Sequence, residues 1–230
     1  MSEYSDTSPS LQIVIWSFTM KTTVFASALM ATIFPLTVNA ASSSQNLGPE
    51  VVKPAPKVSI ASHDAFFNHL KAHCGKAYQG KVTVDKQDNG AFSGKKLVMH
   101  VRKCSDTELQ IPFHVGEDAS RTWIITKTGS GLSLKHDHRM KNGEYDVSTM
   151  YGGHTVDAGW QHAQSFPADQ YSKELFIKQG IPQSNGNTWQ IFIYPEKYTY
   201  RLVREGREFR VDFDLTNPVT PPAAPWGYKD

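Results

Sequence analysis

The sequence predicts a mainly β protein: a single antiparallel up-and-down β-barrel with a short N-terminal helix and a short helical insertion. Some eight to ten short segments alternate apolar and polar residues, and turn-forming residues separate them at regular spacing. Tight turns join consecutive segments, which favours sequential hairpins, and few segments carry the residues that protect an open sheet edge. A two-sheet β-sandwich is the alternative.

The first forty residues have the pattern of an upstream extension followed by a signal peptide. Lys21 precedes the apolar run VFASALMATIFPLTV, and the small residues Val38 and Ala40 precede a cleavage site. We expect translation to start at Met20 and cleavage to fall near Ala40, which predicts a periplasmic or extracellular protein. A genuine but long n-region is the alternative for residues 1–19. The apolar run is too short for a good spanning helix, so no stable membrane span is expected after cleavage.

The rest of the chain divides into three parts. Residues 41–60 are rich in Ser, Pro and Val without clear periodicity, which predicts a flexible linker. Residues 61–216 carry the alternating pattern and are long enough for one barrel domain. Residues 217–230 form a Pro-rich tail that cannot continue a sheet. The formal net charge is +2 without a long basic run, so nucleic acid is not the expected partner.

The first elements are a helix and a strand. Ser62 opens the helix, Phe66, Phe67 and Leu70 recur at helical spacing, and Gly75 supplies the stop. After Gly75 the period changes to two over AYQGKVTVD, which predicts the first strand.

Four strand candidates follow, at KLVMHVRKC, LQIPFHV, TWIITKT and LSLKHDHR, and VSTMYGGHTV continues as a strand with a glycine-marked kink. Pro112 opposes the apolar face of LQIPFHV and suits a sheet edge or a bulge. Residues 166–180 (FPADQYSKELFIKQG) predict a helical insertion that could cover one end of the barrel, with the first helix at the other. TWQIFIY, KYTYRLV and REFRVDFDL complete the meander.

Cys74 and Cys104 are the only two cysteines of the chain. In an exported protein an even cysteine count most simply predicts a disulfide, which would stabilise the fold by about 3–4 kcal/mol. A catalytic thiol is the alternative, and neither cysteine lies in a CxxC or nucleophile motif.

The candidate site centres on LSLKHDHRM, residues 132–140. In a strand, Leu132, Leu134, His136 and His138 share one face, and the leucines indicate that this face points inward. We expect the leucines deep in the barrel and the histidines near an opening. An H-x-H pair can also reach one metal ion such as zinc. A third ligand would come from a nearby polar side chain: His154, Asp157 or His162.

Other interpretations of this strand remain open. His136 and His138 could simply be hydrogen-bonded to backbone or water, and proton-transfer chemistry is a further alternative. Lys135, Asp137 and Arg139 project to the other face, which predicts a solvated, salt-bridged surface or a polar recognition patch.

The glycine-marked kink and the strand aromatics complete the candidate set. Gly152 and Gly153 permit a bulge or a close backbone approach, and a kink toward the interior would hold nearby side chains beside the histidines. The aromatic residues either fill a core or line a ligand cavity. The candidate ligand-binding residues are His136, His138, Tyr151, His154, Trp123 and Trp189, and the candidate metal ligands are His136, His138 and His154.

The run LKHDHRMKNGEYDVSTMYGG, followed by SFPADQYSKELF and REFRVDFDL, is similar to an uncharacterised group of exported bacterial proteins that share LKHDHR, YGG and FPAD signatures. The overall plan also resembles the calycin barrels of the lipocalin type, which bind small apolar ligands. The resemblance covers nearly all of the chain after the signal peptide. It implies a barrel, and it implies no known activity and no functional residues.

Three functions therefore compete. The first is an exported barrel that binds a small molecule of unknown identity. The second is a metal-binding protein or metal-dependent hydrolase that uses His136 and His138. The third is an envelope structural or interaction module with a filled core. No GxSxG, HExxH, phosphate-loop or calcium-loop motif occurs, so hydrolase and kinase interpretations have no positive motif.

Overall fold

The computed structural model describes residues 58–86, 90–92 and 94–229, so the expected extension, signal peptide and most of the linker lie outside the described residues. In this part of the chain no helix has the length and apolar character that crossing a bilayer requires. The elements are α1 (Ala61–Lys71), β1 (Ala77–Asp85), β2 (Leu97–His100), β3 (Lys103–Cys104), β4 (Glu108–Val115), β5 (Asp118–Lys127), β6 (Leu132–His138), β7 (Tyr151–His154), β8 (Ala163–Pro167), α2 (Gln170–Lys178), the 3-10 helix η1 (Pro182–Gly186), β9 (Thr188–Tyr194), β10 (Lys197–Arg204) and β11 (Arg207–Val219).

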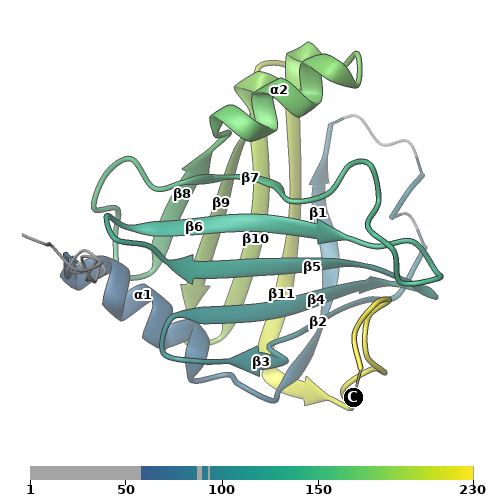
Figure 1. Cartoon of the computed structure of the whole chain (residues 1–230). Coiled ribbons are helices and arrows are strands. Elements are labelled where there is room, and N and C mark those ends of the chain that lie inside the picture. Colours follow the sequence, from purple (N-terminus) through teal and green to yellow (C-terminus); the bar gives the residue numbers. More distant parts are fainter. Residues whose placement is uncertain (1–57, 87–89, 93, 230) are drawn as a thin grey trace, which may run out of the picture. The chain divides into compact units, whose positions relative to one another are not determined.

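Ten strands form one antiparallel meander in the order β7-β6-β5-β4-β2-β1-β11-β10-β9-β8, and the short β3 pairs with β4. The two ends of this order meet, because Gly153 of β7 and Ala168, just after β8, form an isolated bridge. The sheet therefore curls into a nearly closed barrel (Figure 1). This confirms the predicted single up-and-down barrel over the sandwich.

The strand register sorts the inner face into rows. Residues of β4, β5 and β6 pair directly across the strands. Along each strand, residues that point inward alternate with residues that point outward. The rows change from apolar to polar along the barrel. They are Leu109, Ile125 and Leu134, then Ile111, Trp123 and His136, and finally Phe113, Arg121 and His138. We call this last row the polar rim.

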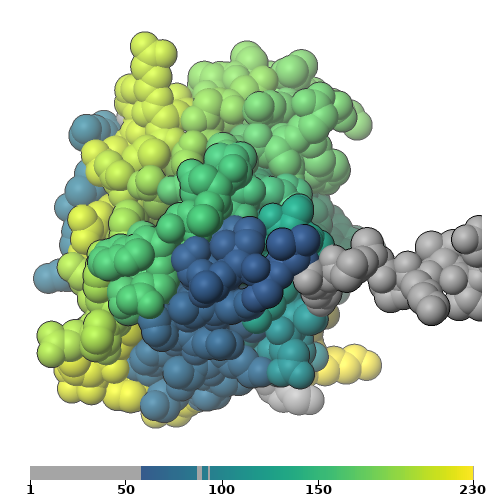
Figure 2. Space-filling view, turned by 90° about the vertical axis from the view of Figure 1, so that its left-hand side faces the viewer, coloured from purple at the N-terminus to yellow at the C-terminus, as the bar shows by residue number. Residues whose placement is uncertain are grey.

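Helix α1 packs its apolar face into the same core. Phe66, Phe67 and Leu70 are buried in one cluster with the deep residues of the sheet. The helix is also tied to the segment after β7, because the Ser62 hydroxyl donates to the carbonyl oxygen of Ala158. Figure 2 shows α1 in blue directly beside this green segment. The expected helix is thus present and contributes to the barrel core.

Cys74 and Cys104 form a disulfide that joins the turn after α1 to β3. The bond confirms the predicted pairing.

The predicted strand KLVMHVRKC is divided, since β2 ends at His100 and β3 begins at Lys103. The amide of Arg102, which lies between β2 and β3, donates to the carbonyl of Gln110 on β4. Residues two apart on a strand direct their backbone groups to the same side, so the backbone of Pro112 faces this gap between β2 and β3. A proline without an N–H group fits there because no β2 or β3 residue pairs with it.

Gly152 and Gly153 allow β7 to close the barrel. A Cβ atom at Gly152 would lie 1.9 Å from the carbonyl oxygen of Leu134, and one at Gly153 would lie 1.9 Å from that of Pro167. The glycine pair therefore serves a close backbone approach on both sides of β7, one of the two roles that the sequence predicts for it.

Two boundaries differ from the expected ones. The helical insertion was expected from Phe166, but Phe166 belongs to β8, whose pairing with β9 continues to Pro167. Helix α2 starts only at Gln170, after the Asp169 carboxylate caps it by accepting from the Ser172 amide. Strand β11 also continues to Val219, past the expected domain boundary at residue 216.

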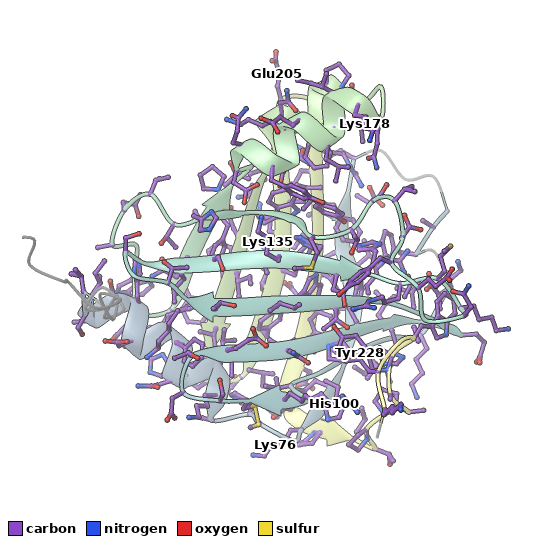
Figure 3. The ribbon with its side chains drawn as sticks, in the orientation of Figure 1. Lys76, His100, Lys135, Lys178, Glu205 and Tyr228 are labelled. Carbon is purple, nitrogen blue, oxygen red and sulfur yellow. A yellow bond between two sulfur atoms is a disulfide. The ribbon has the colours of Figure 1, made fainter. Side chains whose placement is uncertain are left out.

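The outer face of β6 is covered rather than solvated. Asp137 is only 1 % exposed, and it accepts from Arg139 Nε at 3.0 Å and from the Tyr228 hydroxyl at 2.5 Å. The amide of Trp226 donates to the carbonyl of Ala119, which holds the C-terminal segment against β5 (Figure 3). The predicted ion pair exists, but the expected solvated face is wrong because residues distant in sequence return to cover it.

Candidate functional site

A cavity of about 340 Å³ lies on the inner face of the barrel, next to the polar rim. Strands β4–β7 supply one wall, strands β9–β11 supply the opposite wall, and residues of α2 and η1 extend over the opening. The structure brings five of the six candidate residues together in this lining. They are Trp123, His136, His138, Tyr151 and Trp189.

The hydrogen bonds of His136 fix its tautomer. Nδ1 lies 3.1 Å from the carbonyl oxygen of Tyr151, which can only accept, so Nδ1 carries the proton. Burial lowers the pKa of His136 to about 3, so the ring is neutral and Nε2 is an acceptor. The Tyr200 hydroxyl, 2.8 Å away on β10, therefore donates to Nε2. This contact joins opposite walls of the barrel across the cavity.

His138 is the second neutral imidazole of the cavity. Burial, and next the positive charge of Arg121, lower the pKa of His138 to about 4. Its Nε2 atom lies 3.1 Å from the Tyr151 hydroxyl, and burial raises the pKa of this phenol to about 12. Both histidines and Tyr151 are thus uncharged at neutral pH, and these hydrogen bonds are made within the fold.

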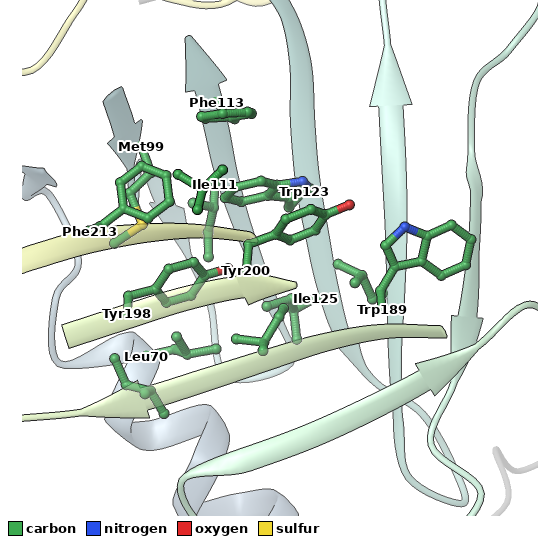
Figure 4. Packing of buried hydrophobic residues seen from close by; sticks show 14 of the residues in the cluster. Leu70, Met99, Ile111, Phe113, Trp123, Ile125, Trp189, Tyr198, Tyr200 and Phe213 are labelled. Atoms are coloured by element: carbon green, nitrogen blue, oxygen red, sulfur yellow. The ribbon is translucent and has the colours of Figure 1, made fainter. Parts of the chain in front are cut away.

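Flat aromatic faces form most of the apolar wall. Trp123 and Tyr200 stack with ring centroids 4.5 Å apart and 13° between their planes, and they lie face to face in Figure 4. Phe113 stacks on the other side of Trp123 at 4.9 Å, and His136 stacks on Tyr151 at 4.6 Å. Phe113 and Tyr200 thus cover both faces of Trp123, and these rings together give the cavity an apolar aromatic wall.

Six polar residues of the lining were not among the sequence candidates: Arg121, Ser148, Gln179, Ser184, Asn187 and Arg207. Arg121 shares strand parity with Trp123, so alternation alone could have indicated it. Asn187 is 7 % exposed, and its Oδ1 atom has no hydrogen-bond partner among the described residues. No sequence signal marks Asn187 or Arg207, because barrel closure brings them to the cavity.

His154 does not join the cluster. Strand β7 pairs with β6 without a bulge, from Ser133 opposite His154 to His136 opposite Tyr151. Regular alternation therefore sends His154 outward, where its Nδ1 lies 3.5 Å from Asp169 Oδ2 and its side chain is 50 % exposed. The expectation that the glycine kink would hold His154 near the histidine pair is wrong, because the kink closes the barrel without changing parity.

The metal interpretation loses its expected third ligand. His162 Nδ1 bonds to the carbonyl of Ile193, and Asp157 offers its carbonyl oxygen to His63, both away from the cavity lining. Within residues 58–86, 90–92 and 94–229, no three His, Cys, Asp or Glu side chains gather to hold a metal ion. A metal at His136 would also have to displace one of its two hydrogen bonds.

Comparison of the chain with protein-family models, with curated proteins and with solved structures gives no match. Functional inference for this chain therefore depends on the geometry of the cavity.

Proposed function

We propose that the protein is an exported β-barrel that binds a small molecule in the cavity beside the polar rim. The observation that carries the proposal is a cavity of about 340 Å³ whose walls combine stacked aromatic rings with a few converging polar groups. Small-molecule sites typically have this size and composition. No catalytic step is needed to account for the arrangement.

The polar groups favour binding over a purely structural core. A filled barrel would leave no room beside His136 and His138, and most buried polar atoms in proteins have a hydrogen-bond partner. Here the cavity remains, and Asn187 Oδ1 has no partner in the described chain. A guest that contacts the Asn187 amide would supply the missing hydrogen bond, which supports a bound ligand more than a solid interaction module.

Export is part of the same proposal. The Cys74–Cys104 disulfide is typical of proteins in oxidising compartments, and this agrees with the signal peptide expected before Ala40. The protein would then meet its ligand in the periplasm or outside the cell.

Native mass spectrometry of the full-length chain, expressed in an export-competent bacterium and purified from the compartment where it accumulates, tests both parts. We expect a protein that begins at or near residue 41 and carries one additional organic mass, which is lost on denaturation. A full-length cytoplasmic product overturns export. A protein without an additional mass that also fails to bind aromatic probes overturns the binding function.

A further inference from the structure

The charged residues of the cavity lining all have the same sign. Arg121 and Arg207 line it, and the lining residues include no Asp or Glu, while Asp118 pairs with Arg121 and Asp85 with Arg207 from outside the lining. The two histidines add no charge, because their pKa values of about 3 and about 4 keep them neutral. A guest in the cavity therefore meets two arginines, each paired with an aspartate outside the lining, and uncharged side chains, but no carboxylate.

Arg121 is placed to reach a guest. It pairs directly with His138 on β6 and with Phe113 on β4, so its side chain belongs to the polar rim. Asp118, which is outside the cavity lining, accepts with Oδ2 from Arg121 Nη1 at 2.5 Å and so binds one edge of the guanidinium. The guanidinium keeps further N–H donors in a planar fork, which suits a carboxylate.

The aromatic wall begins in the adjacent row. Trp123 is two residues from Arg121 on the same face of β5, and it stacks with Tyr200 from the opposite wall. A ring bound beside this stacked pair would hold a substituent near Arg121, since residues two apart on a strand are separated by about 7 Å.

We propose that the ligand is a planar aromatic monoanion, with its carboxylate on Arg121 and its ring beside the stacked pair of Trp123 and Tyr200. The inference rests on the proposed binding function and names the chemical class of its ligand. It separates this class from apolar chains, which would leave Arg121 unused, and from cations, for which the lining offers no carboxylate.

Isothermal titration calorimetry with four matched compounds tests the proposal on the purified protein. 2-Naphthoate is the anion, 2-naphthamide is its neutral isostere, 2-naphthylmethylammonium is the cation, and decalin-2-carboxylate keeps the charge without the flat ring. We expect 2-naphthoate to bind at least tenfold more tightly than the amide and at least fivefold more tightly than the decalin acid, and the ammonium compound to bind most weakly.

Two variants assign the preference to Arg121. Arg121→Gln should reduce the affinity for 2-naphthoate about tenfold while leaving the affinity for 2-naphthamide within twofold, and Arg121→Lys should retain part of the preference. Arg201→Gln is the matched control, because Arg201 is on the outer face of β10 with Glu208 and Gln190. Thermal unfolding of each variant shows that the fold is retained.

The outcomes distinguish the two proposals. Equal binding of the acid and the amide, or an unchanged preference in Arg121→Gln, overturns the anion assignment and leaves small-molecule binding intact. Equal binding of the naphthoate and the decalin acid overturns the planar ring. A copurified organic mass with no affinity for any of the four compounds also overturns this assignment alone. The absence of both a bound mass and probe binding overturns the binding function itself.

Discussion

The Tyr200 hydroxyl on β10 donates a hydrogen bond to Nε2 of His136 on β6 over 2.8 Å, so one contact spans the barrel interior. His136 is 3 % exposed, and its Nδ1 proton is already donated to the Tyr151 carbonyl. The orientation of this imidazole is therefore set from two sides. It can neither turn toward a guest nor gain a proton without breaking a bond that the fold uses.

Tyr200→Phe should lower the free energy of unfolding by about 1–3 kcal/mol, because it leaves the buried Nε2 acceptor of His136 without a donor. Urea denaturation measures the change. Tyr194→Phe is the matched control, since Tyr194 is 36 % exposed and its loss should cost less than about 0.5 kcal/mol. Equal effects of the two substitutions would contradict the bridging role of Tyr200.

Stability should fall as the pH falls below about 6.5. His136 and His138 have pKa values of about 3 and about 4 in the fold, against about 6.5 when unfolded. The unfolded state therefore binds more protons between these values, and each histidine contributes a loss of roughly 1.4 kcal/mol per pH unit. Urea titrations from pH 7 to pH 5 measure the slope. The double variant His136→Gln/His138→Gln should reduce the slope, part of which stays because burial also lowers the pKa of His73, His100 and His114. An unchanged slope would refute the assignment.

Gly153→Ala should destabilise the barrel by more than about 3 kcal/mol, because the new Cβ would lie 1.9 Å from the Pro167 carbonyl oxygen at the junction of β7 and β8. Thermal and urea unfolding report the loss. Gly129→Ala is the control, since no atom lies within 4 Å of its Cβ position, and its effect should stay within about 1 kcal/mol. A fully stable Gly153→Ala protein would show that β7 does not need the close approach.

Replacing both cysteines by alanine should lower the free energy of unfolding by about 3–4 kcal/mol, since Cys74 and Cys104 close a loop with a sequence separation of 30. The same loss should follow reduction of the native protein before denaturation. Agreement between the two measurements assigns the effect to the covalent bond. A loss seen only in the substituted protein would assign it to packing instead.

Zinc provides a direct test of the metal interpretation. His136 uses both ring nitrogens in hydrogen bonds, and His154 is on the outer face. Dialysis against zinc followed by elemental analysis should therefore leave less than about 0.1 equivalent on the protein after gel filtration. One retained equivalent that disappears in His136→Ala/His138→Ala would restore the metal site and require the cavity to rearrange.

The strand pattern in the sequence was sufficient for the barrel and for the inward histidines. Leu134 and His136 share a face because side-chain alternation is local, and the structure places them at 0 % and 3 % exposure. Arg121 follows the same rule, since it shares the inner face of β5 with Trp123. A glycine pair also permits a bulge, so the pattern alone leaves the orientation of His154 open, and the regular register of β7 with β6 directs it outward.

Long-range contacts account for what the sequence did not predict. Asn187 and Arg207 reach the cavity only when β8–β11 fold against β4–β7. Asp137 is covered by Tyr228, which is 91 residues away in sequence, so no local pattern could indicate its burial. Strand β8 is five residues long and directly precedes α2, and its apolar Phe166 was assigned to the helix instead.

Because β1 pairs with β11, the barrel can form only when the described chain is present up to its last strand. The first strand of the meander finds one of its two neighbours only when residues 207–219 are present. Until then β1 keeps an open edge, and such edges pair with those of other chains. Fragments that end before β11 should therefore aggregate rather than form stable partial barrels. During synthesis, β1 can complete its pairing only after β11 has left the ribosome.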